Sequence, residues 1–114
     1  MTTKTAEPLD LPAPVAAYFV ADTTGAEAVA QCFTDDAVVI DERQEYRGRA
    51  AIAGWKAEVS AKFRYTVDRI GAHVSGDQTT VTGRVTGDFP GSPVDLQYHF
   101  TLEGGKIARL EIAP

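Results

Sequence analysis

The second half of this 114-residue chain changes its hydrophobic period from 3.6 to 2, and no other feature constrains the fold as strongly. Four segments have the strand period, namely residues 63–75, 79–89, 94–103 and 106–113. Short turns join them, at Gly76-Asp77, Pro90-Gly91 and Gly104-Gly105. Because such short connections join antiparallel strands, the pattern predicts a four-stranded meander. Pro90-Gly91 fits the two central positions of a type II turn.

The alternation also predicts that the sheet has two different faces. In residues 94–103 one face carries Leu96, Tyr98, Phe100 and Leu102, and the other carries Asp95, Gln97, His99 and Thr101. The preceding strand repeats this division. One face is therefore expected to bury a core, and the other is rich in threonine and charge.

The first half reads as three helices with one hairpin between the second and the third. Pro12 and Pro14 suit the first turn of a helix. One face of that helix then carries residues at helical spacing, namely Val15, Tyr18, Phe19 and Asp22. Residues 24–27 read as a capping box, with Thr24 at the N-cap, for a short second helix that ends near residue 33. The third helix is predicted from residue 49 to about 61, with Ile52, Trp55 and Val59 as its apolar stripe and Lys56, Glu58 and Lys62 off it.

The stretch from residue 33 to 48 carries two acids where the predicted strand 37–41 meets its turn. Asp41 ends that strand, Glu42 follows it, and the chain returns through residues 45–47. Alternation does not orient the strand, because Val38 and Ile40 favour one face while Ala37 and Val39 favour the other. The order of elements predicts an α+β domain over residues 12–114, with residues 1–11 as a loose tail.

Composition excludes several classes of function. The net charge of −5 argues against a sequence-independent hold on nucleic acid, which needs clustered Lys and Arg. No apolar run approaches the ~18 residues of a membrane span, and the N-terminus has no apolar signal region, so a cytoplasmic protein is expected. Cys32 is the only cysteine, and two isolated histidines give no metal signature.

Five short motifs carry a family resemblance over residues 12–113. They are Tyr18, Phe33-x-x-Asp36-Ala37, Gly48-x-x-x-Ile52, His99-Phe100 and Gly105-Lys106-Ile107. In this order the chain resembles the nuclear transport factor 2-like superfamily, in its SnoaL-like and ketosteroid-isomerase-like branch. The resemblance implies a cone-shaped roll, in which a strongly bent mixed or antiparallel sheet wraps three helices and leaves a pocket at the wide end. It also implies a homodimer that pairs through the sheet face.

The resemblance to ketosteroid isomerase implies roles for three residues. Asp41 takes the position of the general base and Tyr18 that of a phenolic hydrogen-bond donor. Tyr98 stands where the isomerase has a second carboxylic acid, and Glu42 where it has a proline, so a steroid substrate is not expected. Candidates for the apolar pocket wall are Val15, Phe19, Trp55, Phe89 and Leu96.

Two classes of function therefore stay open. One is a small cofactor-free and metal-free enzyme that performs acid/base chemistry on a small hydrophobic carbonyl compound, as an isomerase, lyase, cyclase or hydrolase. The other is a non-catalytic ligand-binding or dimeric interaction module. At the level of single residues, Asp41 can equally begin a turn, and Tyr18 and Trp55 can equally be plain core residues.

Overall fold

The structure is a computed structural model that describes residues 11–114. The helices are α1 (Ala13–Asp22), α2 (Ala26–Gln31) and α3 (Arg49–Lys62). The strands are β1 (Phe33–Asp41), β2 (Gln44–Arg47), β3 (Tyr65–Ser75), β4 (Gln78–Gly87), β5 (Val94–Glu103) and β6 (Lys106–Ala113). Most of the predicted N-terminal tail lies outside the described residues, and Leu11, its last residue, packs against the core.

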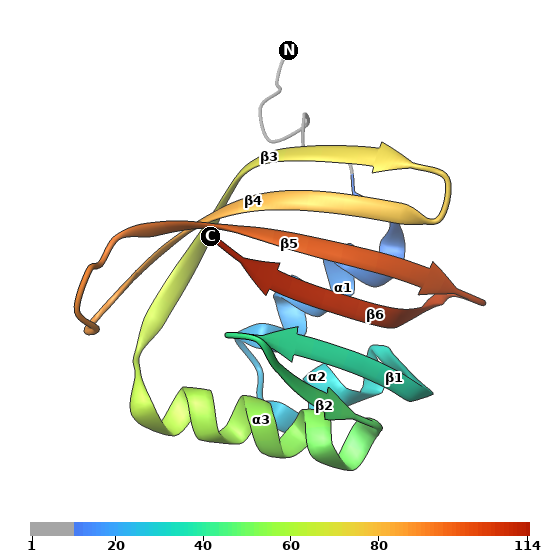
Figure 1. The fold of residues 1–114 in the computed structure, drawn as a ribbon, viewed down its shortest axis with the longest axis horizontal. Coiled ribbons are helices and arrows are strands. Elements are labelled where there is room, and N and C mark those ends of the chain that lie inside the picture. The colour runs from blue at the N-terminus through green and yellow to red at the C-terminus, as the bar shows by residue number, and fades with distance from the viewer. Residues whose placement is uncertain (1–10) are drawn as a thin grey trace.

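All six strands form one mixed sheet in the order β2-β1-β6-β5-β4-β3. Among the strands of residues 11–114, β1 and β6 run parallel, and every other neighbouring pair is antiparallel. Figure 1 shows the three helices on one side of this curved, unclosed sheet, with α3 beneath β1 and β2. The predicted α+β class with helices on one face is therefore confirmed, as is the meander of the last four strands.

The direction in which β1 points its side chains is now fixed. Ala37 and Val39 are fully buried, whereas Val38 and Ile40 are only partly covered. Asp41 follows in the same parity as Ala37 and Val39, so its carboxylate lies on the inner face of the sheet. The chain then turns through Glu42 and Arg43, which both have positive φ angles of 53° and 67° and so form a two-residue hairpin turn.

Aromatic rings fill the space between α1 and the sheet. The Tyr18 ring meets the rings of Phe19, Phe33 and Phe100 edge-on, with centroids 5.2 to 6.1 Å apart. Phe19 and Tyr98 make a further edge contact at 5.4 Å. This cluster confirms the predicted inward face of α1. The type II turn is also confirmed, because Ser92 N donates to Phe89 O across Pro90 and a Gly91 with φ of 91°.

Two local predictions are wrong. The capping box does not form: Gly25 is the N-cap of α2, and the Thr24 hydroxyl donates to Val20 O at 3.1 Å, which satisfies a carbonyl at the end of α1 instead. Lys56 is not on the exposed face of α3 but 3% exposed, because its ammonium group reaches the carboxylate of Asp22 at the end of α1. Within residues 11–114, no helix is long and apolar enough to cross a bilayer.

Candidate active site

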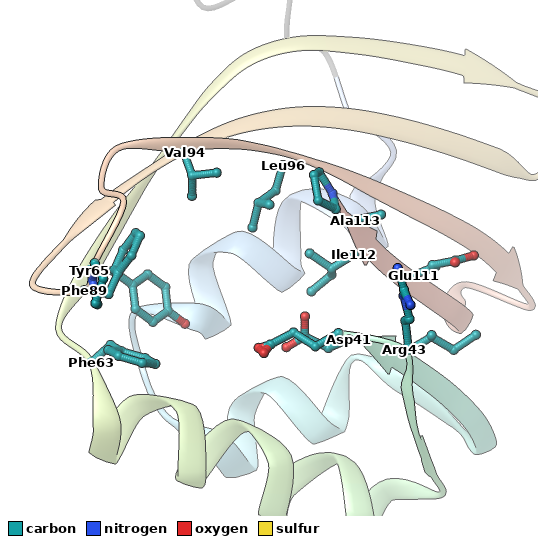
Figure 2. Close-up of a pocket in the computed structure, with 14 residues that line it drawn as sticks. Asp41, Arg43, Phe63, Tyr65, Phe89, Val94, Leu96, Glu111, Ile112 and Ala113 are labelled. Carbon is teal, nitrogen blue, oxygen red and sulfur yellow. The ribbon is translucent and has the colours of Figure 1, made fainter.

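A cleft of about 880 Å³ opens beside Asp41 on the inner side of the sheet. It is bounded by the β1–β2 turn, the start of β3, the β4–β5 loop and the last residues of β6. Figure 2 shows Asp41 on one side of the cleft and the rings of Phe63, Tyr65 and Phe89 on the other. The lining residues are Ile40, Asp41, Glu42, Arg43, Phe63, Tyr65, Phe89, Pro90, Val94, Leu96, Glu111, Ile112, Ala113 and Pro114. The volume is in the range of small-molecule sites.

One of the two oxygens of the Asp41 carboxylate accepts a hydrogen bond from the described residues. Trp55 Nε1 donates a hydrogen bond to Asp41 Oδ2 over 3.0 Å, which ties the end of β1 to the middle of α3. No other hydrogen bond reaches this carboxylate from within residues 11–114. An ionised carboxylate has about four lone-pair sites, so Oδ1 keeps the capacity to accept a proton from a ligand.

Behind the cleft lies a smaller inner cavity of about 90 Å³, which is lined by Tyr18, Asp22, Asp41, Trp55, Lys56, Val59, Tyr65, Leu96, Tyr98 and Ile112. Four of these residues, Asp41, Tyr65, Leu96 and Ile112, also line the cleft. The two spaces therefore adjoin each other, and the inner one has room for a carbonyl group or a few waters.

Three phenols face this inner cavity and stay protonated. Burial raises the pKa of Tyr18 well above its usual value, with Asp22 as the next largest cause. Burial likewise raises the pKa of Tyr65 and of Tyr98, and the nearby Asp22 and Asp41 carboxylates raise both further. A phenol that keeps its proton is a hydrogen-bond donor, so the cavity offers donors next to the Asp41 base.

Gly83 makes room for one of these phenols. A Cβ atom at this position would lie 2.9 Å from the Tyr98 ring and 2.9 Å from Val67 Cγ1. Gly83 is paired with Leu96 across the β4–β5 ladder, and the missing side chain leaves room for the edge of the Tyr98 ring over β4. The orientation of Tyr98 in the cavity thus depends on a residue without a side chain.

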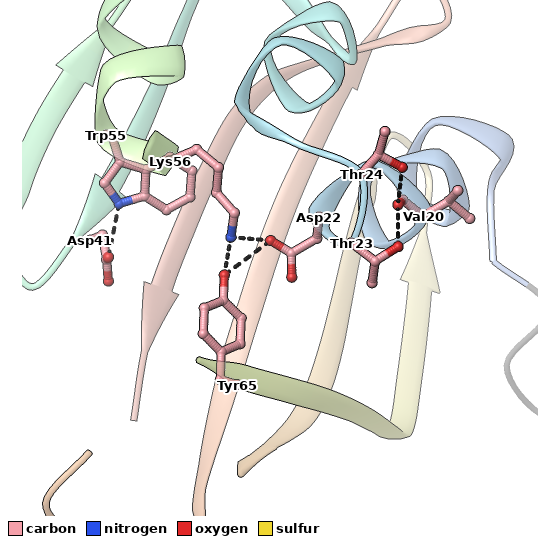
Figure 3. A network of polar contacts seen from close by, with 8 residues as sticks. All are labelled: Val20, Asp22, Thr23, Thr24, Asp41, Trp55, Lys56 and Tyr65. Carbon is pink, nitrogen blue, oxygen red and sulfur yellow. Dashed lines mark hydrogen bonds and ion pairs between the residues drawn. The ribbon is translucent and has the colours of Figure 1, made fainter. Parts of the chain in front are cut away.

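A buried ion pair closes the inner end of the cavity. The side chains of Lys56 and Asp22 are 4% and 8% exposed, and the Lys56 ammonium contacts both Asp22 Oδ1 and the Tyr65 hydroxyl. Tyr65 in turn donates to Asp22 Oδ1 over 3.1 Å, as Figure 3 shows. Burying two charges costs more free energy than an exposed pair does, so such a pair beside a cavity is a candidate for function.

The structure separates the predicted site residues into three groups. Asp41, Phe89 and Leu96 line the cleft, whereas Tyr18, Tyr98 and Trp55 line only the inner cavity or a small pocket beside it. Val15 is fully buried and Phe19 is 7% exposed; both belong to the core cluster and line neither space. Their helical face turns toward the aromatic core, so the wall prediction does not hold for these two.

The sequence interpretation missed several lining residues, among them Tyr65, Phe63 and Lys56. Tyr65 and Phe63 lie at the junction of α3 and β3, where a predicted strand start gave no signal for a pocket. Lys56 was assigned to solvent because a lysine next to an apolar stripe is normally exposed. The sequence feature that could have indicated a buried lysine is Asp22, because an acid on the apolar face of α1 needs a buried partner. Within the described residues, no three His, Cys, Asp or Glu side chains converge as a metal site.

A bent mixed sheet with three helices on its inner side and a cleft beside β1 is the nuclear transport factor 2-like fold, and solved structures with this fold match the chain. Residues 15–110 match the family model described as a SnoaL-like domain, so the chain belongs to the SnoaL-like family. No match was found among curated proteins.

Three solved structures illustrate the relationship. A candidate polyketide cyclase, SMa1630 from Sinorhizobium meliloti, is 42% identical, with a TM-score of 0.87 over 92% of this chain and 97% of the other. A hypothetical protein with a ketosteroid isomerase-like fold from Catenulispora acidiphila is 25% identical, with a TM-score of 0.80 over 90% and 85%. A candidate ketosteroid isomerase from Kribbella flavida is 18% identical, with a TM-score of 0.73 over 90% and 76%, which shows the fold alone.

Proposed function

We propose that this protein is an enzyme that removes a proton from a carbon next to the carbonyl group of a small hydrophobic compound. One observation carries the proposal: the Asp41 carboxylate and two buried phenols, Tyr18 and Tyr98, line the same cavity at the end of an apolar cleft. Proton abstraction beside a carbonyl needs such a base together with donors for the oxygen on which negative charge develops.

In the proposed reaction, Trp55 holds Asp41 Oδ2 while Oδ1 accepts the proton from the substrate carbon. The electrons of the broken C–H bond move into an enolate, and the enolate oxygen accepts hydrogen bonds from Tyr98 and Tyr18. Each well-placed donor contributes about 3 kcal/mol to stabilising the transition state. Asp41 then returns its proton, either to another carbon in an isomerisation or to the oxygen formed when the enolate closes a ring in an aldol cyclisation.

A polyketide-like compound is the substrate class that fits best. The 42%-identical Sinorhizobium meliloti protein is a candidate polyketide cyclase. The cleft has apolar walls from Val94, Leu96 and Ile112, and the Phe63 and Phe89 rings meet edge-on at 5.9 Å on its far side. Aromatic and aliphatic walls of this kind suit a cyclic or ring-forming hydrophobic molecule. Asp41 is the carboxylate that the cleft shares with the inner cavity, and it would orient such a molecule.

A ligand-binding protein without turnover is the second candidate. It is favoured by the small size of the inner cavity, about 90 Å³, since Trp55, Tyr65 and Tyr98 leave space for only a narrow group beside Asp41. A molecule held in the cleft with no acidic carbon within reach of Asp41 is then bound but not converted.

The exchange of carbon-bound protons distinguishes these candidates. The bicyclic ketone 2-tetralone is incubated in D₂O with the protein, and the loss of its α-proton signals is followed by NMR. We expect acceleration by the native protein, a fall of 100-fold or more for Asp41→Asn, and near-native rates for Glu103→Gln, whose side chain is exposed at the end of β5 and lines neither the cleft nor the inner cavity. Tyr98→Phe is expected to slow exchange by about 100-fold while binding is retained.

Two results would contradict the enzyme proposal. If the ketone binds but exchanges no faster than in buffer, the protein is a binding module. If Asp41→Asn exchanges protons as fast as the native chain, another group is the base.

We also propose that two copies pair through the outer face of the sheet. That face carries cross-strand contacts between side chains of β4 and β5, from Thr80 to His99, from Thr82 to Gln97 and from Arg84 to Asp95. Polar rows of this kind can form a hydrogen-bonded interface. Sedimentation equilibrium tests the pairing, and a monomer at micromolar concentration that is unchanged by Thr82→Arg would contradict it.

A further inference from the structure

A second cleft of about 550 Å³ adjoins the first and shares Phe63 and Tyr65 with it. It is formed by the ends of α1 and α3 and the first half of β3, and its lining residues are Phe19, Asp22, Thr23, Ser60, Phe63, Arg64, Tyr65, Thr66, Val67 and Arg69. We call this space the arginine groove. The proposed reaction makes no use of it.

Arg69 is placed on the inner face of the sheet, where the other strands carry apolar side chains. It continues the parity of Tyr65 and Val67 along β3, and its guanidinium carbon lies 5.4 Å from the centre of the Phe19 ring. The β3–β4 register shifts directly after it, between Arg69 and Gly71. A guanidinium over an aromatic floor keeps its outer edge free for an anion.

Neither arginine of the groove forms an ion pair within the described residues, although the Asp88 carboxylate accepts a hydrogen bond from the Arg64 backbone N–H over 2.9 Å. Arg47, Arg49, Arg84 and Arg109 each have a carboxylate partner, whereas neither Arg64 nor Arg69 has one among residues 11–114. The groove has one lining carboxylate, that of Asp22, which is 8% exposed and already paired with Lys56. In a chain with net charge −5, two arginines without an ion-pair partner line one groove and make it a local site that attracts anions.

The remaining walls are apolar or carry hydroxyl groups. Phe19, Phe63 and Val67 provide an apolar floor, and Thr23, Ser60 and Thr66 provide the hydroxyls. A simple inorganic anion would leave these apolar side chains exposed to water. A molecule with an apolar body and one acidic group would cover the floor and meet the guanidiniums at the same time.

We infer that the arginine groove binds a small amphipathic carboxylate, with its apolar body on Phe19 and Val67 and its carboxylate on Arg64 and Arg69. This site shares Phe63 and Tyr65 with the cleft but does not include Asp41, and it does not rest on the proposed reaction. Tyr65 and Asp22 line both the groove and the inner cavity, so a ligand in the groove is in contact with the wall of the candidate active site.

The test is a ¹⁵N–¹H NMR titration with 2-naphthoate and, as a neutral match of the same shape, 2-naphthamide. We expect 2-naphthoate to shift the amide signals of residues 19–23 and 60–69, and to bind at least tenfold more tightly than 2-naphthamide. The double variant Arg64→Gln/Arg69→Gln is expected to lose that preference. Both side chains are exposed, so the variant should fold, and its spectrum shows directly whether it does.

Arg47→Gln is the matched control, because Arg47 is an exposed arginine of the same sheet that is paired with Glu45 and lines neither cleft. It should bind 2-naphthoate as the native protein does. The inference is overturned if the shifts map to residues 40–43 and 111–113 instead, or if the double variant binds 2-naphthoate with unchanged affinity. It is also overturned if the single change Arg69→Gln causes self-association without weakening the binding of 2-naphthoate. The inward-pointing charge of Arg69 would then serve to prevent the β3 edge from pairing with another chain, and not to bind a ligand.

Discussion

Replacing Lys56 with methionine should destabilise the protein more than most single substitutions. The change keeps the length of the side chain but leaves the Asp22 carboxylate, 8% exposed, with Tyr65 as its remaining hydrogen-bond donor. At an effective dielectric constant of about 20 and a contact distance of ~3 Å, the lost attraction is on the order of 5 kcal/mol. Removing one partner of a buried pair typically costs about 3 to 5 kcal/mol. Asp22 also ends α1, where a negative charge faces the negative end of the helix dipole.

Urea unfolding followed by circular dichroism measures the loss. With a slope of about 1.5 kcal/mol per molar urea, a loss of 4 kcal/mol lowers the midpoint by roughly 2.7 M. The double variant Lys56→Met/Asp22→Leu removes both charges and is expected to recover most of the stability, because an apolar pair of similar volume replaces a buried ion pair at little cost. A loss below about 1 kcal/mol for Lys56→Met, or a double variant as unstable as the single one, would refute the assignment of a buried pair.

Three further outcomes follow from the packing. Gly83→Ala should destabilise the protein by about 1 to 3 kcal/mol in the same urea assay, because the added Cβ would lie 2.9 Å from the Tyr98 ring. Gly54→Ala in α3 should stabilise it by about 0.5 to 1 kcal/mol, because the added Cβ would meet nothing within 4 Å. Thr79→Val should raise the melting temperature, since the Thr79 hydroxyl is buried without a partner in the described residues, and a lower melting temperature would show a missed contact. The free energy of unfolding should fall by about 4 kcal/mol per pH unit above pH ~10, because burial raises the pKa of Tyr18, Tyr65 and Tyr98 in the folded state while the unfolded chain ionises first; an unchanged stability at pH 11 would contradict this.

The order of the elements was predictable because it is encoded locally. Period-2 alternation and glycine turns mark the last four strands, and helical spacing around Tyr18 and Ile52 marks the first and third helices. The parallel pairing of β1 with β6 was not predictable in this way, since it joins the first strand of the chain to the last. Nothing in a local pattern reports which distant strand will be the neighbour.

The site was predictable only in part, for a similar reason. The resemblance placed Asp41 on the inner face, which alternation alone left open, and the burial of Ala37 and Val39 has the matching parity. Lys56 and Tyr65 escaped prediction because each is held at the cavity by a tertiary partner, Asp22, that is far away in sequence. At Thr24 the local sequence motif predicted a hydrogen bond that does not form. The Thr24 hydroxyl donates to the carbonyl of Val20 in the preceding helix instead of capping the next one.

A crystal structure with 2-tetralone bound tests the central claim most directly. The account predicts that the ketone lies in the 880 Å³ cleft, with its carbonyl oxygen in the inner cavity within hydrogen-bond distance of the Tyr98 or Tyr18 hydroxyl. Its acidic carbon should then lie about 3 to 3.5 Å from Asp41 Oδ1. A ketone bound with its carbonyl group toward solvent and its acidic carbon away from Asp41 would contradict the account.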